Sequence, residues 1–162
     1  MTGAVMQMVS HGLMTALFFA VIGMIYDRTH TRMVNDMGGL MKVMPFISTV
    51  LFIVGLCSLG LPGLSGFVAE MTVFVGSWEN AGTFHRIATI AAAASIVVTA
   101  VYILRAIGQT VMGPPHPHPL SPGGEGGHLL TDAAWNERLA AIILVAGILA
   151  IGIAPFWLND LI

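Results

Sequence analysis

Four apolar stretches, each long enough to cross a lipid bilayer as a helix, take up most of this chain. A transmembrane helix needs about 20 predominantly apolar residues, with roughly 17 to 25 as the working range. The stretches cover residues 3–26, 43–78, 86–112 and 136–158. Only 9% of the residues are charged, whereas soluble domains carry about 25%. We therefore expect a single all-α integral membrane domain with about four transmembrane helices, surrounded by lipid.

The composition also excludes several partners and cofactors. The formal net charge is −2, so the chain has no basic surface with which to hold nucleic acid. Its single cysteine, Cys57, cannot form an intrachain disulfide or supply the four thiolates of an iron–sulfur cluster. We interpret Cys57 as a small buried hydrophobic residue. We expect neither a cofactor nor a metal on this chain, and any redox centre must then lie on another subunit.

The second stretch is too long to be one straight transmembrane helix. Its 36 residues would rise about 54 Å, against about 30 Å of hydrocarbon. We predict a break at residues 61–66, because Pro62 removes a backbone donor while Gly63 and Gly66 permit unusual backbone angles. The stretch is then either a hairpin of two short spans or one discontinuous helix. We favour the discontinuous helix, because residues 67–78 would rise only about 18 Å.

The connections between the stretches predict an orientation. Lys and Arg gather on the cytoplasmic side of membrane proteins, and a single crossing by the broken stretch would place five of the six on one side. These five are Arg28, Arg32, Lys42, Arg105 and Arg138. Loops 27–42 and 113–135 are therefore predicted to be cytoplasmic, with Arg86 on the opposite face.

The third connection begins with a linker rich in Gly and Pro. Residues 113–130 should be extended and mobile, because such a composition cannot build a helix. We do not expect its His116 and His118 to hold a metal, because an extended chain does not converge ligands. Thr131 or Asp132 is predicted to be the N-cap of the last helix.

Glu70 is the carboxylate inside the second stretch, and an intramembrane carboxylate is a functional candidate by default. Protonating an ordinary glutamate at pH 7 costs about 3.7 kcal/mol, while a charge at the bilayer centre costs roughly 2.5 to 3.5 kcal/mol. Because the two costs nearly balance, a neighbouring group or a water molecule can decide the protonation state. We interpret Glu70 as a proton relay. The alternative is a permanently neutral glutamate hydrogen-bonded between helices.

Two stripes of polar residues accompany Glu70. On the first stretch Gln7, His11 and Thr15 recur at helical spacing, and the imidazole of His11 can pass a proton between its two nitrogens. The alternative for His11 is a hydrogen-bonded packing residue. The second stripe lies on the third stretch and could order a file of water, although interhelical hydrogen bonding is the simpler interpretation. Its members are Ser95, Thr99 and Tyr102, followed by Arg105 and Gln109.

Five runs of residues stand out as motifs. They are Ser10-His11-Gly12, Tyr26-Asp27-Arg28-Thr29-His30-Thr31-Arg32, Met37-Gly38-Gly39-Leu40, Leu61-Pro62-Gly63 and Gly66-Phe67-Val68-Ala69-Glu70. These runs resemble the antiporter-like membrane subunits of respiratory complex I, in particular their chain M or chain 4 branch. The Tyr-Asp-Arg-Thr-His-Thr-Arg run is fairly specific, and a carboxylate at position 70 separates this branch from sister subunits that typically carry a lysine there. The resemblance covers nearly the whole chain except the linker.

The resemblance implies a fold and a function. The family fold is a bundle of fourteen helices with two inverted five-helix repeats, and this chain matches its last four helices. By the resemblance, Glu70 is the terminal protonatable residue of a proton route, and His11 is a relay one helix earlier. The family's other route residues, a glutamate on its fifth helix and lysines on its seventh and eighth, have no counterpart here. We therefore expect a C-terminal portion of a proton-translocating subunit.

The resemblance also implies partners and a location. These are the other membrane-arm subunits of an NADH-quinone oxidoreductase in a bacterial plasma membrane, with flavin and iron–sulfur clusters on other chains and no direct binding of quinone here. An alternative within the class is a subunit of a multisubunit cation/proton antiporter or a membrane-bound hydrogenase. An alternative outside it is a non-catalytic membrane assembly protein.

Overall fold

The computed structural model describes residues 2–80, 82–113 and 131–156, and in this part of the chain every regular element is helical. The linker predicted at 113–130, with His116 and His118, lies almost wholly outside the described residues. The elements are α1 (Thr2–Thr29), a 3-10 turn η1 (Val34–Asp36), α2 (Leu40–Val43), α3 (Pro45–Ser58), α4 (Ser65–Glu79), α5 (Thr83–Ile107), a π-helical extension η2 (Gly108–Met112) and α6 (Trp135–Ile153).

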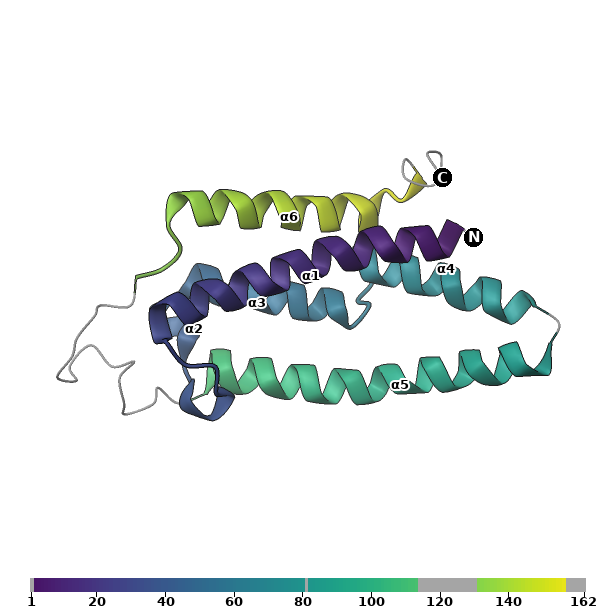
Figure 1. Ribbon diagram of the computed structural model, residues 1–162, viewed down its shortest axis with the longest axis horizontal. Coiled ribbons are helices and arrows are strands. Elements are labelled where there is room, and N and C mark those ends of the chain that lie inside the picture. The colour runs from purple at the N-terminus through teal and green to yellow at the C-terminus, as the bar shows by residue number, and fades with distance from the viewer. Residues whose placement is uncertain (1, 81, 114–130, 157–162) are drawn as a thin grey trace.

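The helices form a bundle in which three are long and apolar enough to cross a membrane, namely α1, α5 with its extension, and α6. Helices α3 and α4 follow one another end to end in the same direction between α1 and α5 (Figure 1), and both contact these two helices. Together they make the fourth crossing. The predicted discontinuous helix is confirmed, and the hairpin interpretation is wrong because α4 continues away from α3 instead of returning beside it.

The break itself occupies residues 59–64, two residues earlier than predicted. Pro62 and Gly63 lie in it, and Gly60 and Gly63 adopt positive φ angles of 64° and 94°, which favour glycine. Gly66 does not belong to the break, because it lies in the first turn of α4. A Cβ there would stand 2.5 Å from the carbonyl oxygen of Cys57, so Gly66 serves close packing of α4 against α3.

The prediction of the N-cap of α6 is wrong. The N-cap residue is Ala134, whose backbone N–H donates to the Glu137 carboxylate at 2.7 Å. Asp132 instead reaches across to α3, where its two oxygens accept the N–H groups of Phe46 at 3.0 Å and Ile47 at 3.3 Å. The first N–H groups of a helix have no partner within it, so Asp132 supplies from another segment the capping that α3 lacks.

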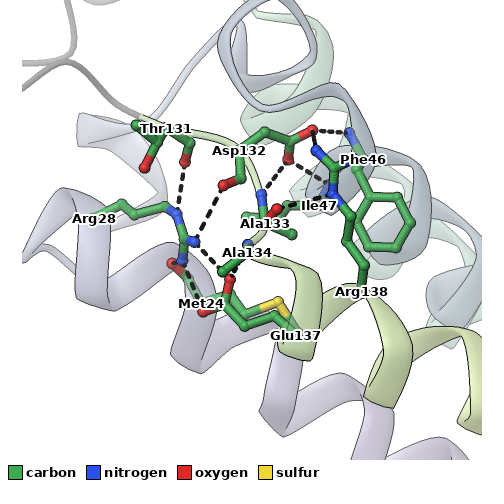
Figure 2. Close-up of polar contacts among 10 residues, drawn as sticks. All are labelled: Met24, Arg28, Phe46, Ile47, Thr131, Asp132, Ala133, Ala134, Glu137 and Arg138. Carbon is green, nitrogen blue, oxygen red and sulfur yellow. Dashed lines mark hydrogen bonds and ion pairs between the residues drawn. The ribbon is translucent and has the colours of Figure 1, made fainter.

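A polar cluster fastens this end of the bundle, and we name Arg28, Asp132, Glu137 and Arg138 the clamp (Figure 2). The Arg28 guanidinium donates to Glu137 at 2.6 Å, to the Thr131 carbonyl at 2.7 Å and to the Met24 carbonyl at 2.8 Å. Arg138 donates to the Ala133 carbonyl at 2.8 Å and pairs with Asp132 at 3.5 Å. Such charge-assisted bonds, most of them partly buried, hold the ends of α1, α3 and α6 together.

The hydrophobic core lies between α1, α3 and α6, where Leu17, Val54 and Ile148 are fully buried. The other end of α6 packs against the break. A Cβ at Gly152 would collide with the backbone at Gly63 and Leu64, so this glycine brings α6 close to the interrupted segment. Small residues at helix contacts are the usual means of such close approach in membranes.

Candidate functional site

The Glu70 side chain points back toward the break. Glu70 is the sixth residue of α4, and helical side chains lean toward the N-terminus of their helix. A Cβ at Gly60 would lie 2.5 Å from Oε2 of Glu70, so the carboxylate rests directly against the bare Cα of Gly60. The interruption of the helix thus makes the space in which the carboxylate lies.

Among the residues that the structure describes, none makes a hydrogen bond or an ion pair with the half-buried Glu70 side chain. The alternative interpretation, a glutamate hydrogen-bonded between helices, therefore finds no partner residue for Glu70 in the described part of the bundle. A carboxylate in this setting can take or release a proton without first breaking a protein contact.

Two cavities meet at Glu70. The first, of about 190 Å³, lies against α1 and is lined by Gln7, Ser10, His11, Met14, Cys57, Ser58, Gly66 and Glu70. The second, of about 250 Å³, lies against α5 and is lined by Ser58, Leu59, Glu70, Phe74, Ala92, Ser95, Ile96 and Thr99. We name them the α1 cavity and the α5 cavity. Each has hydroxyl, amide or imidazole groups in its wall, as a site that holds water requires.

The amide oxygen of Gln7 gives a specific reason to expect water in the α1 cavity. This oxygen is buried and has no hydrogen-bond partner among the described residues. A buried polar atom left without a partner costs about 1 to 3 kcal/mol, and ordered water is the usual remedy. The α1 cavity is large enough for several water molecules, because one takes up roughly 30 Å³ in the liquid.

The structure brings together most of the residues singled out from the sequence. Gln7 and His11 line the α1 cavity, Ser95 and Thr99 line the α5 cavity, and Glu70 lines both. Two candidates for the water file do not belong to this site. They are Thr15, one turn beyond His11, and Tyr102, whose residue is 58% exposed on the outside of α5.

The hydroxyls of the α5 stripe differ from the expected pattern. Ser95 donates to the Ala92 carbonyl at 2.7 Å and Thr99 to the Ser95 carbonyl at 3.2 Å, so both bonds stay within α5. The interhelical hydrogen bonds expected of these two residues are therefore not formed in the described part of the bundle. Their oxygens keep lone pairs with which to accept a hydrogen bond from water in the α5 cavity.

A buried hydroxyl pair beside the break was missed in the sequence analysis. Ser10 on α1 donates to Ser65, the first residue of α4, at 2.8 Å, and the Cys57 sulfur lies 3.7 Å from the same Ser65 oxygen. All three residues are buried. Cys57 is small and buried as expected, and it also contacts this pair. The available signal was a pair of serines in apolar stretches, Ser10 in the first stretch and Ser65 within the predicted break.

The comparisons with known proteins agree with one another. Residues 1–99 match the family described as "NADH:quinone oxidoreductase/Mrp antiporter, TM". NAD(P)H-quinone oxidoreductase chain 4 1 of Picosynechococcus sp. is 38% identical over 159 residues, which are 96% of this chain and 29% of that protein. The protein of the same name from Synechococcus sp. (strain JA-2-3B'a(2-13)) is 40% identical over 156 residues, 94% of this chain and 29% of that protein.

A solved structure shares the fold. A chain of respiratory complex I from Thermus thermophilus with bound NADH superposes with a TM-score of 0.79 at 27% identity, over 96% of this chain and 30% of that chain. The present chain thus spans less than a third of the length of these relatives. Since the family match covers well over half of the residues, the chain belongs to the NADH:quinone oxidoreductase/Mrp antiporter transmembrane family, in which it resembles a C-terminal part of chain 4.

Proposed function

We propose that this chain is the C-terminal part of a proton-translocating membrane subunit of an NAD(P)H- or NADH-quinone oxidoreductase. In this proposal Glu70 is the residue that takes up and releases the proton, and His11 relays protons to it through the α1 cavity. The names of the chain 4 relatives and of the complex I neighbour support this assignment. Electron transfer to quinone takes place on other subunits, which carry the flavin and the iron–sulfur clusters, and this chain binds neither.

One observation carries the proposal. A carboxylate without a hydrogen-bond partner among the described residues lies at the interruption of a transmembrane helix, between two cavities with polar walls. Irregular backbone at membrane depth is tolerated where it is buried in protein or lines a water-filled cavity. Transporters place ion and proton sites at such interruptions. The break therefore gives Glu70 access to water that an unbroken helix would deny it.

The proposed setting is the membrane arm of the complex in a bacterial plasma membrane. Arg28 and Lys42 lie in the last turns of α1 and α2, and Arg105 lies in the last turn of α5. These turns lie at the same end of the bundle as the start of α6 (Figure 1), which supports cytoplasmic loops at 27–42 and 113–135. Arg86, by contrast, stacks over Trp78 between α4 and α5.

A second candidate function is cation/proton exchange, because the description of the matched family also names Mrp antiporters. The chain 4 names of the relatives favour the oxidoreductase. The two functions differ in the reaction that drives proton movement, and this reaction tells them apart. A complex that pumps protons only while it oxidises a nicotinamide substrate supports the first, and sodium-driven proton movement without electron transfer supports the second.

The test uses the complete subunit in its assembled complex. Glu70→Gln keeps the shape and hydrogen-bonding capacity of the side chain but removes the titrating proton, whereas Glu70→Asp keeps the titration and shortens the side chain. We expect Gln to lower proton pumping and the coupled electron transfer while the complex still assembles, with Asp milder. Protons per electron are measured in membrane vesicles energised with NADH and a quinone. Glu79→Gln is the matched control, because Glu79 is exposed at the other end of the same helix.

A normal ratio of protons to electrons in Glu70→Gln would overturn the proposal. If Glu70 only held helices together, Gln would be nearly silent and Ala would reduce the amount of assembled complex. His11→Ala is combined with Glu70→Gln in the same background. Losses in the double variant that simply add would show that the two residues do not share one route, because sites acting in series are not additive.

A further inference from the structure

Among the residues that the structure describes, the two cavities have two in common, Glu70 and Ser58. Ser58 is the last residue of α3, directly before the break, and it is half-buried. Its neighbour Cys57 lines only the α1 cavity, and Leu59 lines only the α5 cavity. The side of the broken helix that faces both cavities therefore carries one hydroxyl and one carboxylate.

The Ser58 hydroxyl differs from the hydroxyls of several threonines in these helices. Serine and threonine in helices commonly donate to a carbonyl three or four residues earlier. Thr49, Thr72 and Thr110 do so here, at 2.7 to 2.8 Å. In the part of the chain that the structure describes, the Ser58 side chain makes no such bond. Its donor and its two acceptor positions remain available for what occupies the cavities.

We infer that Ser58 is a proton-relay residue that connects the α1 cavity with the α5 cavity across the broken helix, next to Glu70. The inference rests on the proposed function and adds a residue to its route. A hydroxyl can accept one proton from a hydronium ion on one side and release its own proton to water or to the Glu70 carboxylate on the other. On the Ser58 oxygen one O–H bond forms as another breaks, while the hydronium ion becomes water and the released proton forms a new O–H bond on the accepting water or carboxylate. Ser58 therefore ends the step neutral and unchanged.

The connection has a physical reason. Apolar walls separate two bodies of water within a membrane protein, and a proton crosses only where polar groups interrupt the wall. A single carboxylate holds its proton until a second acceptor comes within hydrogen-bond reach, at about 2.6 to 3.2 Å. A hydroxyl in the same wall supplies that acceptor or holds the water molecule that does. Ser58 and Glu70 together can therefore do what neither can do alone.

The experiment compares substitutions at Ser58 with one at Ser48 in the full-length subunit of the assembled complex. Ser48 is the matched control, because it lies on the same helix, is buried, has an unpartnered hydroxyl in the described structure and lines neither cavity. We expect Ser58→Ala to lower proton pumping about five- to tenfold, the loss that corresponds to one net hydrogen bond, and Ser48→Ala to leave it unchanged. Ser58→Thr, which keeps the hydroxyl, should restore pumping.

A second variant and a second measurement guard against mere misfolding. Ser58→Cys keeps the shape of the side chain but offers only a weak donor and acceptor, so its pumping should fall as in Ser58→Ala while the complex assembles normally. Because proton transfer becomes slower in these two variants, the ratio of rates in H₂O and D₂O should rise above that of the unsubstituted complex. A role in packing alone would not change this ratio.

The failure of this inference and the failure of the proposed function are distinguishable. If Glu70→Gln stops pumping but Ser58→Ala pumps like Ser48→Ala, the relay role of Ser58 is overturned and the proposed function stands. If Ser58→Thr pumps no better than Ser58→Ala, the relay role is likewise overturned, because the hydroxyl is not what matters. If Glu70→Gln pumps normally, the proposed function fails and the inference fails with it.

Discussion

Asp132 and Glu70 are both carboxylates in a mostly apolar chain, and their surroundings are opposite. Asp132 accepts the backbone N–H groups of Phe46, Ile47 and Ala133 and pairs with Arg138. Glu70 accepts no hydrogen bond from any described residue and lies between two cavities. A carboxylate held by several donors is fixed in its position, so it suits a structural task. A carboxylate that accepts no hydrogen bond from a described residue can exchange a proton without losing such a bond, as the proposed relay requires.

The largest effect on this comparison is expected from a substitution in the clamp. Asp132→Ala leaves two N–H groups of α3 uncapped and removes the ion pair with Arg138, so we expect a loss of about 1 to 3 kcal/mol in stability. The measurement is the amount of assembled complex and its melting temperature in detergent. The ratio of protons to electrons in the complex that remains should be unchanged. A lower ratio at normal abundance would give Asp132 the role that we propose for Glu70.

The second prediction concerns the break, where two glycines with positive φ offer a matched pair. A Cβ at Gly60 would meet the Glu70 carboxylate, whereas a Cβ at Gly63 would meet nothing within 4 Å. Alanine at either position should cost about 1 to 2 kcal/mol or more in backbone strain. Only Gly60→Ala should also lower the ratio of protons to electrons, because it displaces the carboxylate. If the two variants had the same ratio of protons to electrons, the position of the Glu70 carboxylate against Gly60 would not be what the pumping depends on.

The smallest effect is expected on α5. Tyr102→Phe removes a hydroxyl from an exposed side chain outside both cavities, and stability should stay within about 0.5 kcal/mol with pumping unchanged. Thr99→Val removes a hydroxyl from the wall of the α5 cavity at similar shape, and pumping should fall slightly at unchanged abundance. If Tyr102→Phe lowers pumping more than Thr99→Val does, the assignment of Thr99 to the wall of the α5 cavity and of Tyr102 to its outside is wrong.

The helices could be predicted from the sequence because long apolar stretches in a membrane have few alternatives. The break was also predictable, since Pro62 and Gly63 stand in a stretch too long to be one straight transmembrane helix. The clamp was not predictable, because its residues come from distant parts of the sequence. Asp132 is a good N-cap residue by type, and only the folded chain shows that it caps α3 and not α6.

The candidate site was predictable in part. Glu70 and His11 stand out as polar groups in apolar stretches, and the structure places both in the wall of one cavity. Helical spacing groups Thr99 with Tyr102, but helix packing decides which turn faces the cavity, and spacing alone does not contain that information. Ser58 was passed over because a single serine in an apolar helix is ordinary. Its position matters only because the helix ends there.

The near-equal halves of the broken helix also relate the site to the membrane potential. Helices α3 and α4 have 14 and 15 residues, so the break lies about midway along the crossing. Moving one elementary charge across the whole membrane involves about 2.3 kcal/mol per 100 mV. On the proposed route, a proton that reaches Glu70 from either face has therefore crossed roughly half of the field, about 1.1 kcal/mol per 100 mV. In an energised membrane, the voltage itself then influences how often Glu70 holds a proton.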